Sequence, residues 1–416
     1  MKSEKLQIKN ENLPKGWRNV KLGEIVEKVI DNRGKNPPLS NIKTEYKLID
    51  TLQLTDDTRY PNFDDETKQR YVSEDVYNTW FRTGHPLAGD ILMSTVGSGI
   101  PKWNLFPSEG NFCIAQNLIG LRINKNKANS EFIFYYFRQE TFLKMVKGII
   151  IGGAQPSIKV PHCLDLEIAI PEDINEQKRI AEILSAFDEK IEVNNKIIKT
   201  LEEMAQEVFK EKFNNSEKLI VNSEKLKLEK WKIKDVEDVF VFEKGIEPGS
   251  KYYSETKKEG YIPFYRVRDL DKQSGVDVYI PKKIANGKIC KESDVLISLD
   301  ATVGRIKIGC NGAFSSGIRK VYSKDGFIKN SFIYFWLKTP YIQNTILEHA
   351  SGTTILHAGQ AIKYLKIPFN KEIIKEIQLK AEPMFEKILQ ILEENQKLVA
   401  LRDLLLPKLT SGEIRV

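Results

Sequence analysis

The sequence is built from two copies of one unit, set about 200 residues apart, and this repeat restricts the possible folds more than any other feature. The segment SEFIFYYFR at 130–138 returns as NSFIYFWLK at 330–338. Upstream of each, GDILMSTVGSGIPKW at 89–103 is echoed by SDVLISLDATVGRIK at 293–307. Because the order of segments is kept in both halves, we interpret the chain as an internal duplication. Solenoid repeats have periods of roughly 20–45 residues, so two copies of this length do not indicate a solenoid.

Each half begins with short β-rich runs separated by Gly, Pro, Asn and Asp, with one aromatic segment among them. The β-rich part closes on a short run ending in Ile-Pro, LEIAIP at 166–171 and LKIP at 365–368. The aromatic segments could offer rings for stacking on bases. Their apolar residues recur at helical spacing, however, so we expect them to be core helices of two globular domains.

A long amphipathic tract ends each half, from about Glu172 to Phe213 and from about Lys371 to Leu409. Neither tract can bury its apolar stripe alone, so we predict that the two pack together as an antiparallel coiled coil. The predicted seam consists of Ile180, Leu184, Phe187, Ile191, Asn194, Ile198 and Leu201 in the first tract and of Ile388, Leu392, Asn395, Leu398 and Leu405 in the second. Asn195 and Asn395 fall at matching positions, and a polar seam residue can fix register. Pro383 predicts a late start or a kink in the second tract.

These patterns predict an α+β fold: two tandem globular α/β domains joined by two long antiparallel coiled-coil helices, as a pseudo-two-fold internal repeat. The predicted boundaries are 1–171 for the first globular domain and 172–214 for the central helix. The second globular domain is expected over 215–370, and the C-terminal helix over 371–416.

Composition adds limits on function. The net charge of +7 is compatible with a polyanionic partner but is only a mild signal. No apolar run approaches the roughly 20 residues needed to cross a bilayer, and the N-terminus has no apolar signal-peptide core. The four cysteines are scattered without CxxC spacing, which argues against a disulfide framework or a zinc site and favours a reducing, cytoplasmic location.

The sequence contains no recognised catalytic motif. GKN at 34–36 lacks the hydroxyl of a Walker A loop, and NPPL at 36–39 has Leu39 where amino-methyltransferases carry an aromatic residue to stack on a flipped base. The four histidines show no metal-binding or triad spacing. We therefore expect neither a catalytic centre nor a metal site in this chain.

Three segments resemble one known family. The C-terminal LRDLLLPKLTSGEIRV at 401–416, QKRIAEILSAFDEKIEVNN at 177–195 and LPKGWRNVKLGEI at 13–25 resemble the specificity (S) subunit of Type I restriction–modification systems. The resemblance implies a non-catalytic subunit whose two recognition domains read the halves of an asymmetric, bipartite site on double-stranded DNA. It also implies a scaffold for two modification (M) subunits and, in the larger complex, for restriction (R) subunits. S-adenosylmethionine, ATP and Mg would bind to those partners, and no cofactor to this chain.

Two other interpretations stay open at this point. The chain could be a free-standing enzyme, such as a fused methyltransferase or nuclease, whose site matches none of these motifs. It could also be a degenerate or regulatory relative of the specificity subunits that acts only as an interaction scaffold.

Polar loop residues at equivalent places in the two copies are the candidates for DNA contact, because amides suit the edge of adenine and Arg that of guanine. In the first domain they are Arg33, Lys35, Asn36, Ser98, Lys102, Gln116, Asn117, Gln155, Ser157 and Lys159. In the second domain they are Arg266, Arg268, Thr302, Arg305, Ser316, Arg319, Thr353, Thr354 and His357. Each could instead be a solvated loop residue, a helix cap or a turn former.

Overall fold

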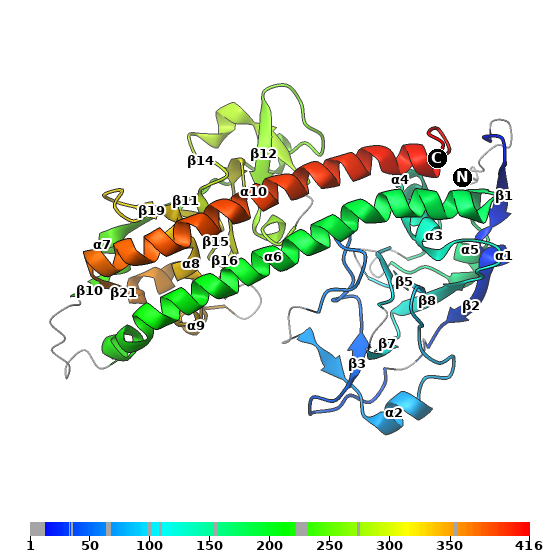
Figure 1. Cartoon of the computed structure of the whole chain (residues 1–416), viewed down its shortest axis with the longest axis horizontal. Helices are drawn as coiled ribbons and strands as arrows, with labels where there is room; N and C mark the ends of the chain where they lie inside the picture. Colours follow the sequence, from blue (N-terminus) through cyan, green and yellow to red (C-terminus); the bar gives the residue numbers. More distant parts are fainter. Residues whose placement is uncertain are drawn as a thin grey trace. The chain divides into compact units, whose positions relative to one another are not determined.

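The computed structural model describes residues 13–32, 34, 36–63, 68–97, 101–107, 110–152, 156–221, 232–272, 275–352 and 356–416, without the side chains of 214–221. Its described residues form two compact units (Figure 1). Unit 1 comprises Met1–Glu192 with Leu398–Val416, and unit 2 comprises Val193–Lys397. Each unit therefore contains one β-rich domain and a portion of both long helices.

Unit 1 contains two sheets and a strand pair that closes the domain. The main sheet has the order β2 (Val26–Ile30), β8 (Leu118–Ile123), β5 (Ile91–Ser94) and β6 (Trp103–Leu105). The second sheet has the order β4 (Arg70–Tyr71), β3 (Tyr46–Ile49) and β7 (Asn111–Ile114), and β1 (Trp17–Lys21) pairs with β9 (Glu167–Pro171). The helices of the domain are α1 (Leu22–Ile25), α2 (Glu74–Thr79), α3 (Ser130–Phe137), α4 (Glu140–Gly148) and α5 (Val160–Leu164).

Unit 2 repeats this plan with additional strands. Its main sheet has the order β11 (Phe240–Lys244), β19 (Ile318–Ser323), β15 (Val295–Ser298) and β17 (Ile306–Lys307). The second sheet has the order β13 (Tyr279–Pro281), β12 (Tyr261–Tyr265), β18 (Gly312–Phe314) and β14 (Ile289–Cys290); β16 (Asp300–Ala301) pairs with β20 (Leu356–His357), and β10 (Lys232–Asp235) with β21 (Lys366–Phe369). The helices are α7 (Val236–Val239), α8 (Asn330–Leu337), α9 (Pro340–Glu348) and the 3-10 turns η3 (Ser250–Tyr252), η4 (Val267–Asp269), η5 (Lys282–Ala285) and η6 (Gly359–Tyr364).

The two domains use the same strand pairings at corresponding places. In unit 1, β5 pairs antiparallel with β8 so that Ser94 lies opposite Leu118. In unit 2, β15 pairs antiparallel with β19 so that Ser298 lies opposite Ile318. The Ile-Pro runs become β9 and β21, which pair with the first strand of their own domain. The predicted fold class, with two α/β domains and two long helices that pack together, is confirmed.

The aromatic segments form α3 and α8, and both are core helices as predicted. Every residue from Phe132 to Phe137 and from Phe332 to Leu337 is buried. In each domain the residue before the helix donates its backbone N–H to a glutamine of the long helix that follows that domain. Asn129 donates to Oε1 of Gln177 over 2.8 Å, and Lys329 donates to Oε1 of Gln378 over 2.6 Å. The aromatic helices thus anchor each domain on its own long helix, and their rings are not available to bases.

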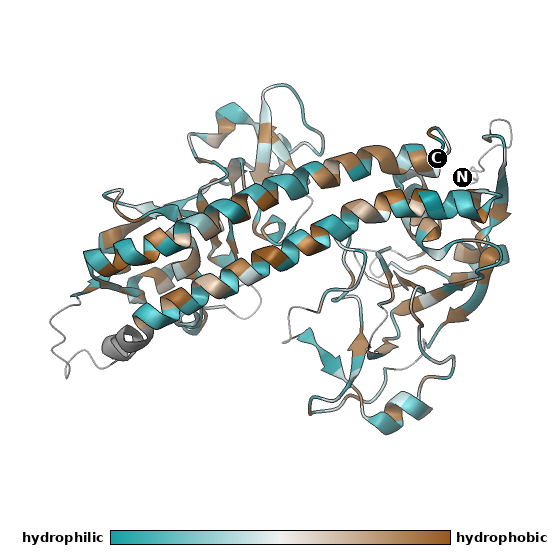
Figure 2. Ribbon diagram, in the orientation of Figure 1, coloured by the Kyte–Doolittle hydropathy of each residue, from teal (hydrophilic) through white to brown (hydrophobic). Residues whose placement is uncertain are grey.

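The long helices α6 (Ile174–Val221) and α10 (Lys371–Thr410) alternate apolar and polar residues along their length (Figure 2). In unit 2 they run antiparallel, because Asn194 contacts Asn395 while Lys212, further along α6, pairs with Glu376, earlier in α10. The predicted seam residues are all buried or partly buried. Most of them also pack into the domain cores, so the stripe is shared between the helix pair and the globular domains.

The start of α10 corrects one prediction. The helix begins at Lys371, well before Pro383, so the late start is wrong. Asn370 explains this, since its Oδ1 accepts from the backbone N–H groups of Glu372 and Ile373 over 3.0 and 3.2 Å and caps the helix. Pro383 lies on the exposed face, where water can bind the backbone carbonyl that the proline leaves without a donor. None of the helices in the described part of the chain has the length and apolar content that a membrane crossing needs.

Candidate nucleic-acid interface

The same backbone clamp brings three loops together at the end of the central strand of each domain. In unit 1 the N–H of Thr95 donates to the carbonyl of Asn117 over 2.9 Å, and the N–H of Ile158 donates to the carbonyl of Thr95 over 2.8 Å. We call residues 95–97, 115–117 and 156–158 loop cluster 1. The clamp joins the end of β5, the turn before β8 and the segment before α5.

Unit 2 builds the clamp again. The N–H of Leu299 donates to the carbonyl of Gly317 over 2.9 Å, and the N–H of Ala358 donates to the carbonyl of Leu299 over 2.7 Å. We call residues 299–304, 315–319 and 356–359 loop cluster 2. The loops that carry corresponding candidates are therefore held by corresponding backbone hydrogen bonds.

A small hairpin adds to each cluster. Ile151 and Ser157 exchange backbone hydrogen bonds of 2.9 Å each, and Ser351 and His357 exchange bonds of 3.0 and 2.8 Å. The hairpins then pair with the loop after the central strand, through Val96 in unit 1 and through β16 in unit 2. Six of the candidates lie outside the described residues: Arg33, Lys35, Ser98, Gln155, Thr353 and Thr354.

The first-domain candidates fall into two groups. Gln116, Asn117 and Ser157 come together in loop cluster 1, with Gln116 half-buried and Nδ2 of Asn117 3.4 Å from Oγ1 of Thr51. The other described candidates lie outside loop cluster 1 or form hydrogen bonds within the domain. Lys102 donates its ammonium to the carbonyl of Leu54 over 3.1 Å, whereas Asn36 and Lys159 are exposed in the loop before β3 and just before α5.

In the second domain, four candidates meet in loop cluster 2: Thr302, Ser316, Arg319 and His357. Nη1 of Arg319 donates to the carbonyl of Ser316 over 2.5 Å, and Oγ of Ser316 donates to Glu247 over 3.2 Å. Burial lowers the pKa of the Arg319 guanidinium, and the nearby Asp300 carboxylate opposes that shift. Thr302 is exposed in the same loop.

The remaining arginine candidates are engaged by carboxylates of their own domain. Nε of Arg266 lies 2.9 Å from Oδ2 of the buried Asp269, and Nη2 of Arg305 lies 2.6 Å from Oδ2 of Asp271. Arg268 is the most exposed, with Nη2 3.7 Å from Asp277. Burial disfavours the charged form of Asp277, yet the neighbouring Lys272, Arg266 and Arg268 hold its pKa below the ordinary value. These cations are already partly neutralised.

Loop cluster 2 contains a residue with a strained backbone. Ala301 has a φ of +63°, in the left-handed region that non-glycine residues rarely adopt. The corresponding residue of the first domain is Gly97, with a φ of +127°. Residues held in such conformations are typical of ligand-contacting loops. The turn beside Ala301 is tight as well, because a Cβ on Gly317 would lie 2.9 Å from Cγ2 of Val267 and 3.3 Å from Cβ of Asp300.

Comparison with known proteins identifies the family. The sequence model described as "Type I restriction modification DNA specificity domain" matches residues 14–203 and 228–393, which together make up well over half of the chain. The chain belongs to this family. It is a specificity subunit, the non-catalytic component that recognises the DNA target within a Type I restriction–modification complex. In this family the cofactors normally lie on the modification and restriction subunits.

Individual relatives match most of the length of this chain. The putative MjaX specificity subunit of Methanocaldococcus jannaschii is 27% identical over 427 residues, covering 97% of this chain and 95% of its own. The MjaIX specificity subunit of the same organism is 29% identical over 318 residues, 71% of each chain. Among solved structures, the S subunit of a Type I restriction–modification system from M. genitalium is 18% identical, covers 97% of this chain and 98% of its own, and has a TM-score of 0.47.

Sequence reasoning missed two carboxylates of the specificity subunit. Oδ1 of Asp300 lies 2.8 Å from Nδ1 of His357, and Glu247 accepts from Ser316. A signal for Asp300 was present in the repeat, since the apolar Val96 occupies the corresponding place in the first domain. Glu247 had no such signal, because its partner lies 69 positions away.

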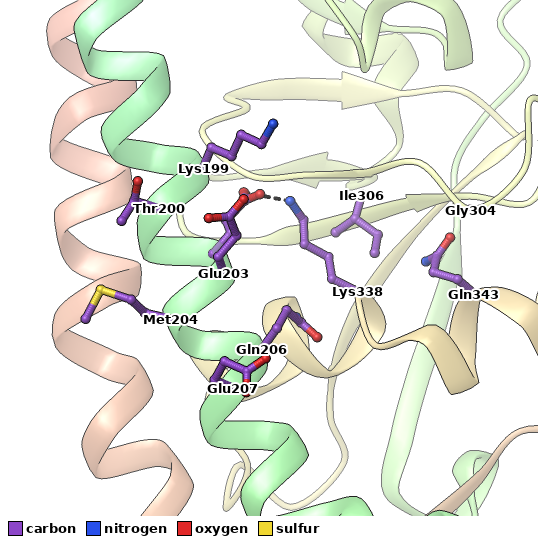
Figure 3. Close-up of a pocket in the computed structure, with 11 residues that line it drawn as sticks. Lys199, Thr200, Glu203, Met204, Gln206, Glu207, Gly304, Ile306, Lys338 and Gln343 are labelled. Carbon is purple, nitrogen blue, oxygen red and sulfur yellow. Dashed lines mark hydrogen bonds and ion pairs between the residues drawn. The ribbon is translucent and has the colours of Figure 1, made fainter. Parts of the chain in front are cut away.

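A cavity of about 880 Å³ lies on unit 2 (Figure 3). It is lined by α6 from Lys199 to Glu207, by Gly304 and Ile306, and by Lys338 and Gln343. Lys338 reaches towards α6 and pairs with Glu202 over 2.6 Å. Gly304 belongs to loop cluster 2, but none of the DNA-contact candidates that the structure describes lines the cavity. Among the described residues, no group of three or more His, Cys, Asp and Glu side chains is placed to hold a metal ion.

Proposed function

We propose that this specificity subunit reads an asymmetric bipartite site on double-stranded DNA, one half with each loop cluster. The observation that carries the proposal is the clamp built twice on equivalent hydrogen bonds but with different side chains. Ser157 in the first domain corresponds to His357 in the second, and Asn117 corresponds to Gly317. A shared frame with different polar groups is suited to reading two different half-sites.

The candidate residues divide by chemistry. Affinity would come from cations on phosphates, and exposed Lys159 and Arg268 suit that role. Base reading would come from Gln116, Asn117 and Ser157 in loop cluster 1 and from the polar residues of loop cluster 2. The candidates outside the described residues belong to the same proposal: Arg33, Lys35, Ser98, Gln155, Thr353 and Thr354.

The wider assembly follows from the same proposal. The specificity subunit would scaffold two modification subunits and, in the larger complex, restriction subunits. S-adenosylmethionine, ATP and Mg would act on those partners, and the complex would work in the cytoplasm, where the DNA is. The recognition domains would comprise 1–171 and 215–370, with spacer helices over 172–214 and 371–416.

Base-resolution mapping of methylated adenines, in cells that carry the complex, tests the proposal. We expect a motif of two different short half-site sequences (words), separated by a spacer of unspecified base pairs. Replacing residues 231–370 by another recognition domain should change one word and leave the other intact. A continuous motif, or a change in both words, would overturn the bipartite reading.

Point variants test which loop cluster reads which half-site. Gln116→Ala in loop cluster 1 and Ser316→Ala in loop cluster 2 form a matched pair of small polar truncations. Each should relax one word only, and the two words should differ. If both variants relax the same word, the two loop clusters do not read separate halves.

A further inference from the structure

His357 and Asp300 form a side-chain pair at the outer edge of loop cluster 2. They lie opposite each other where β16 pairs with β20, with Nδ1 of the ring 2.8 Å from Oδ1 of the carboxylate. The histidine side chain is 62% exposed and that of the aspartate 29%. The ring is therefore open to a ligand while its Nδ1 is occupied.

This hydrogen bond selects one tautomer of the ring. An ionised carboxylate can only accept, so Nδ1 of His357 carries the hydrogen that it donates to Asp300. In its neutral form the ring then has no hydrogen on Nε2, so that this nitrogen can accept a hydrogen bond. On base edges in the major groove, the hydrogen-bond donors are the amino groups of adenine and cytosine.

The surroundings hold the pair in place. Arg319 interacts electrostatically with Asp300 and is itself fastened to the carbonyls of Ser316 and Ile318 over 2.5 and 3.2 Å. The clamp from Ala358 to the carbonyl of Leu299 joins the strands that carry the pair. In the first domain the corresponding residues are Val96 and Ser157, which cannot form such a pair.

We infer that His357 is a specificity-determining residue, accepting at Nε2 a hydrogen bond from the amino group of an adenine or cytosine in one half-site. Asp300 is a positioning residue that fixes the acceptor tautomer. The inference rests on the proposed function and adds to it the base class that one side chain reads.

Motif mapping is the first test. His357→Ala should relax the preference for adenine or cytosine at one position by about fivefold or more, since one discriminating contact is worth on the order of 1 kcal/mol or more. Asp300→Asn should relax the same position, because an amide can donate to Nδ1 and move the ring hydrogen to Nε2. Ser157→Ala, at the corresponding place in the first domain, should leave that position unchanged.

Base analogues separate reading from a structural role. A duplex whose adenine or cytosine at that position lacks the exocyclic amino group should bind the wild-type complex about five- to tenfold more weakly. The His357→Ala and Asp300→Asn complexes should bind the two duplexes equally, within about twofold. A merely structural effect would weaken both duplexes and preserve their ratio, which would overturn the inference.

The other possible outcomes of these experiments also test the inference. If the alanine variant does not fold, as judged by thermal unfolding, His357→Gln replaces it and should discriminate poorly, because its amide both donates and accepts. The inference would be refuted if the variants kept every base preference of the wild-type complex, or if they lost preference only at a guanine or thymine. Either outcome would leave the proposed bipartite function intact. Absence of any motif from the wild-type complex would instead refute the proposed function, and the inference with it.

Discussion

Asn194 of α6 and Asn395 of α10 form a buried amide pair, with Nδ2 of Asn194 2.7 Å from Oδ1 of Asn395. The sequence repeat places Asn395 at the position of Asn195, 200 residues away, whereas its buried partner is Asn194, 201 residues away. Asn395 donates in turn to Oδ1 of Asn195 over 3.0 Å. A buried polar pair between otherwise apolar faces is well suited to fixing helix register, since any shift would leave both amides without partners.

The first prediction concerns this pair. Asn194→Leu leaves the buried amide of Asn395 short of a partner and should lower the free energy of unfolding of unit 2 by about 1–3 kcal/mol. Converting Asn395 to Leu as well removes the unpaired group and should recover most of that loss. Urea unfolding followed by circular dichroism measures both, with the transition of unit 2 fitted separately. A double variant less stable than the single one would contradict the explanation.

The second prediction concerns Asp188 of α6. It accepts from the hydroxyl of Tyr135 over 2.8 Å and pairs with the buried Arg402 over 2.5 Å. Asp188→Asn would leave the guanidinium of Arg402 buried without its main counter-charge, so we expect unit 1 to lose about 3–5 kcal/mol of unfolding free energy.

Asp403 offers a matched control for Asp188, because it binds the same guanidinium over 2.8 Å while its side chain is 57% exposed. Asp403→Asn should cost less than about 1 kcal/mol. Equal losses in the two variants, measured by urea unfolding, would show that burial does not set the strength of this ion pair.

These contacts show where sequence reasoning succeeds and where it stops. Short β-rich runs bounded by turn residues located β5, β8, β15 and β19, because such runs are a local property of the sequence. The partners of individual loop side chains were not predictable. Asp300 meets a histidine 57 positions away, and Lys102 meets a carbonyl 48 positions away, so both contacts arise only from the folded chain. Arg266, chosen as a candidate for DNA contact, lies beside the carboxylate of Asp269 in its own loop.

The third prediction uses the strained turn of loop cluster 2. Ala301→Gly should relieve about 1–2 kcal/mol of left-handed strain and lose about 0.5–1 kcal/mol to the greater entropy of the unfolded chain. The net expectation is a gain of about 0.5–1 kcal/mol in unit 2. Gly97→Ala is the reciprocal change in unit 1 and should destabilise, because its φ of +127° suits only glycine. Urea unfolding should give opposite signs for the two variants, and equal signs would count against the strain.

The fourth prediction concerns acid sensitivity. Glu243 binds Lys288 over 2.9 Å and Lys320 over 3.0 Å. Burial acts to raise the pKa of Glu243, but these two ammonium groups outweigh it and hold the pKa below the ordinary value. A carboxyl with a depressed folded-state pKa stabilises above its unfolded pKa, and that contribution is lost as pH falls through the folded value. Glu243→Gln should therefore make the free energy of unfolding of unit 2 fall less steeply below about pH 4.5. Unfolding titrations at several pH values measure this, with Glu237→Gln, on α7, as the comparison variant.

The fifth prediction separates two lysines of the first domain by their surroundings. Lys159 is exposed beside loop cluster 1, whereas the ammonium of Lys102 is bound to the carbonyl of Leu54. If Lys159 neutralises a phosphate, Lys159→Ala should weaken binding to all sequences alike and reduce the slope of log K against log salt concentration by about 1. Lys102→Met keeps most of the aliphatic stem and should lower the stability of unit 1 while leaving that slope unchanged. Titrations of the assembled complex with duplex DNA at several salt concentrations measure both slopes. Counterion release depends on the number of phosphates neutralised and not on fold stability. A slope reduced by Lys102→Met but unchanged by Lys159→Ala would therefore assign the phosphate contact to Lys102 instead of Lys159.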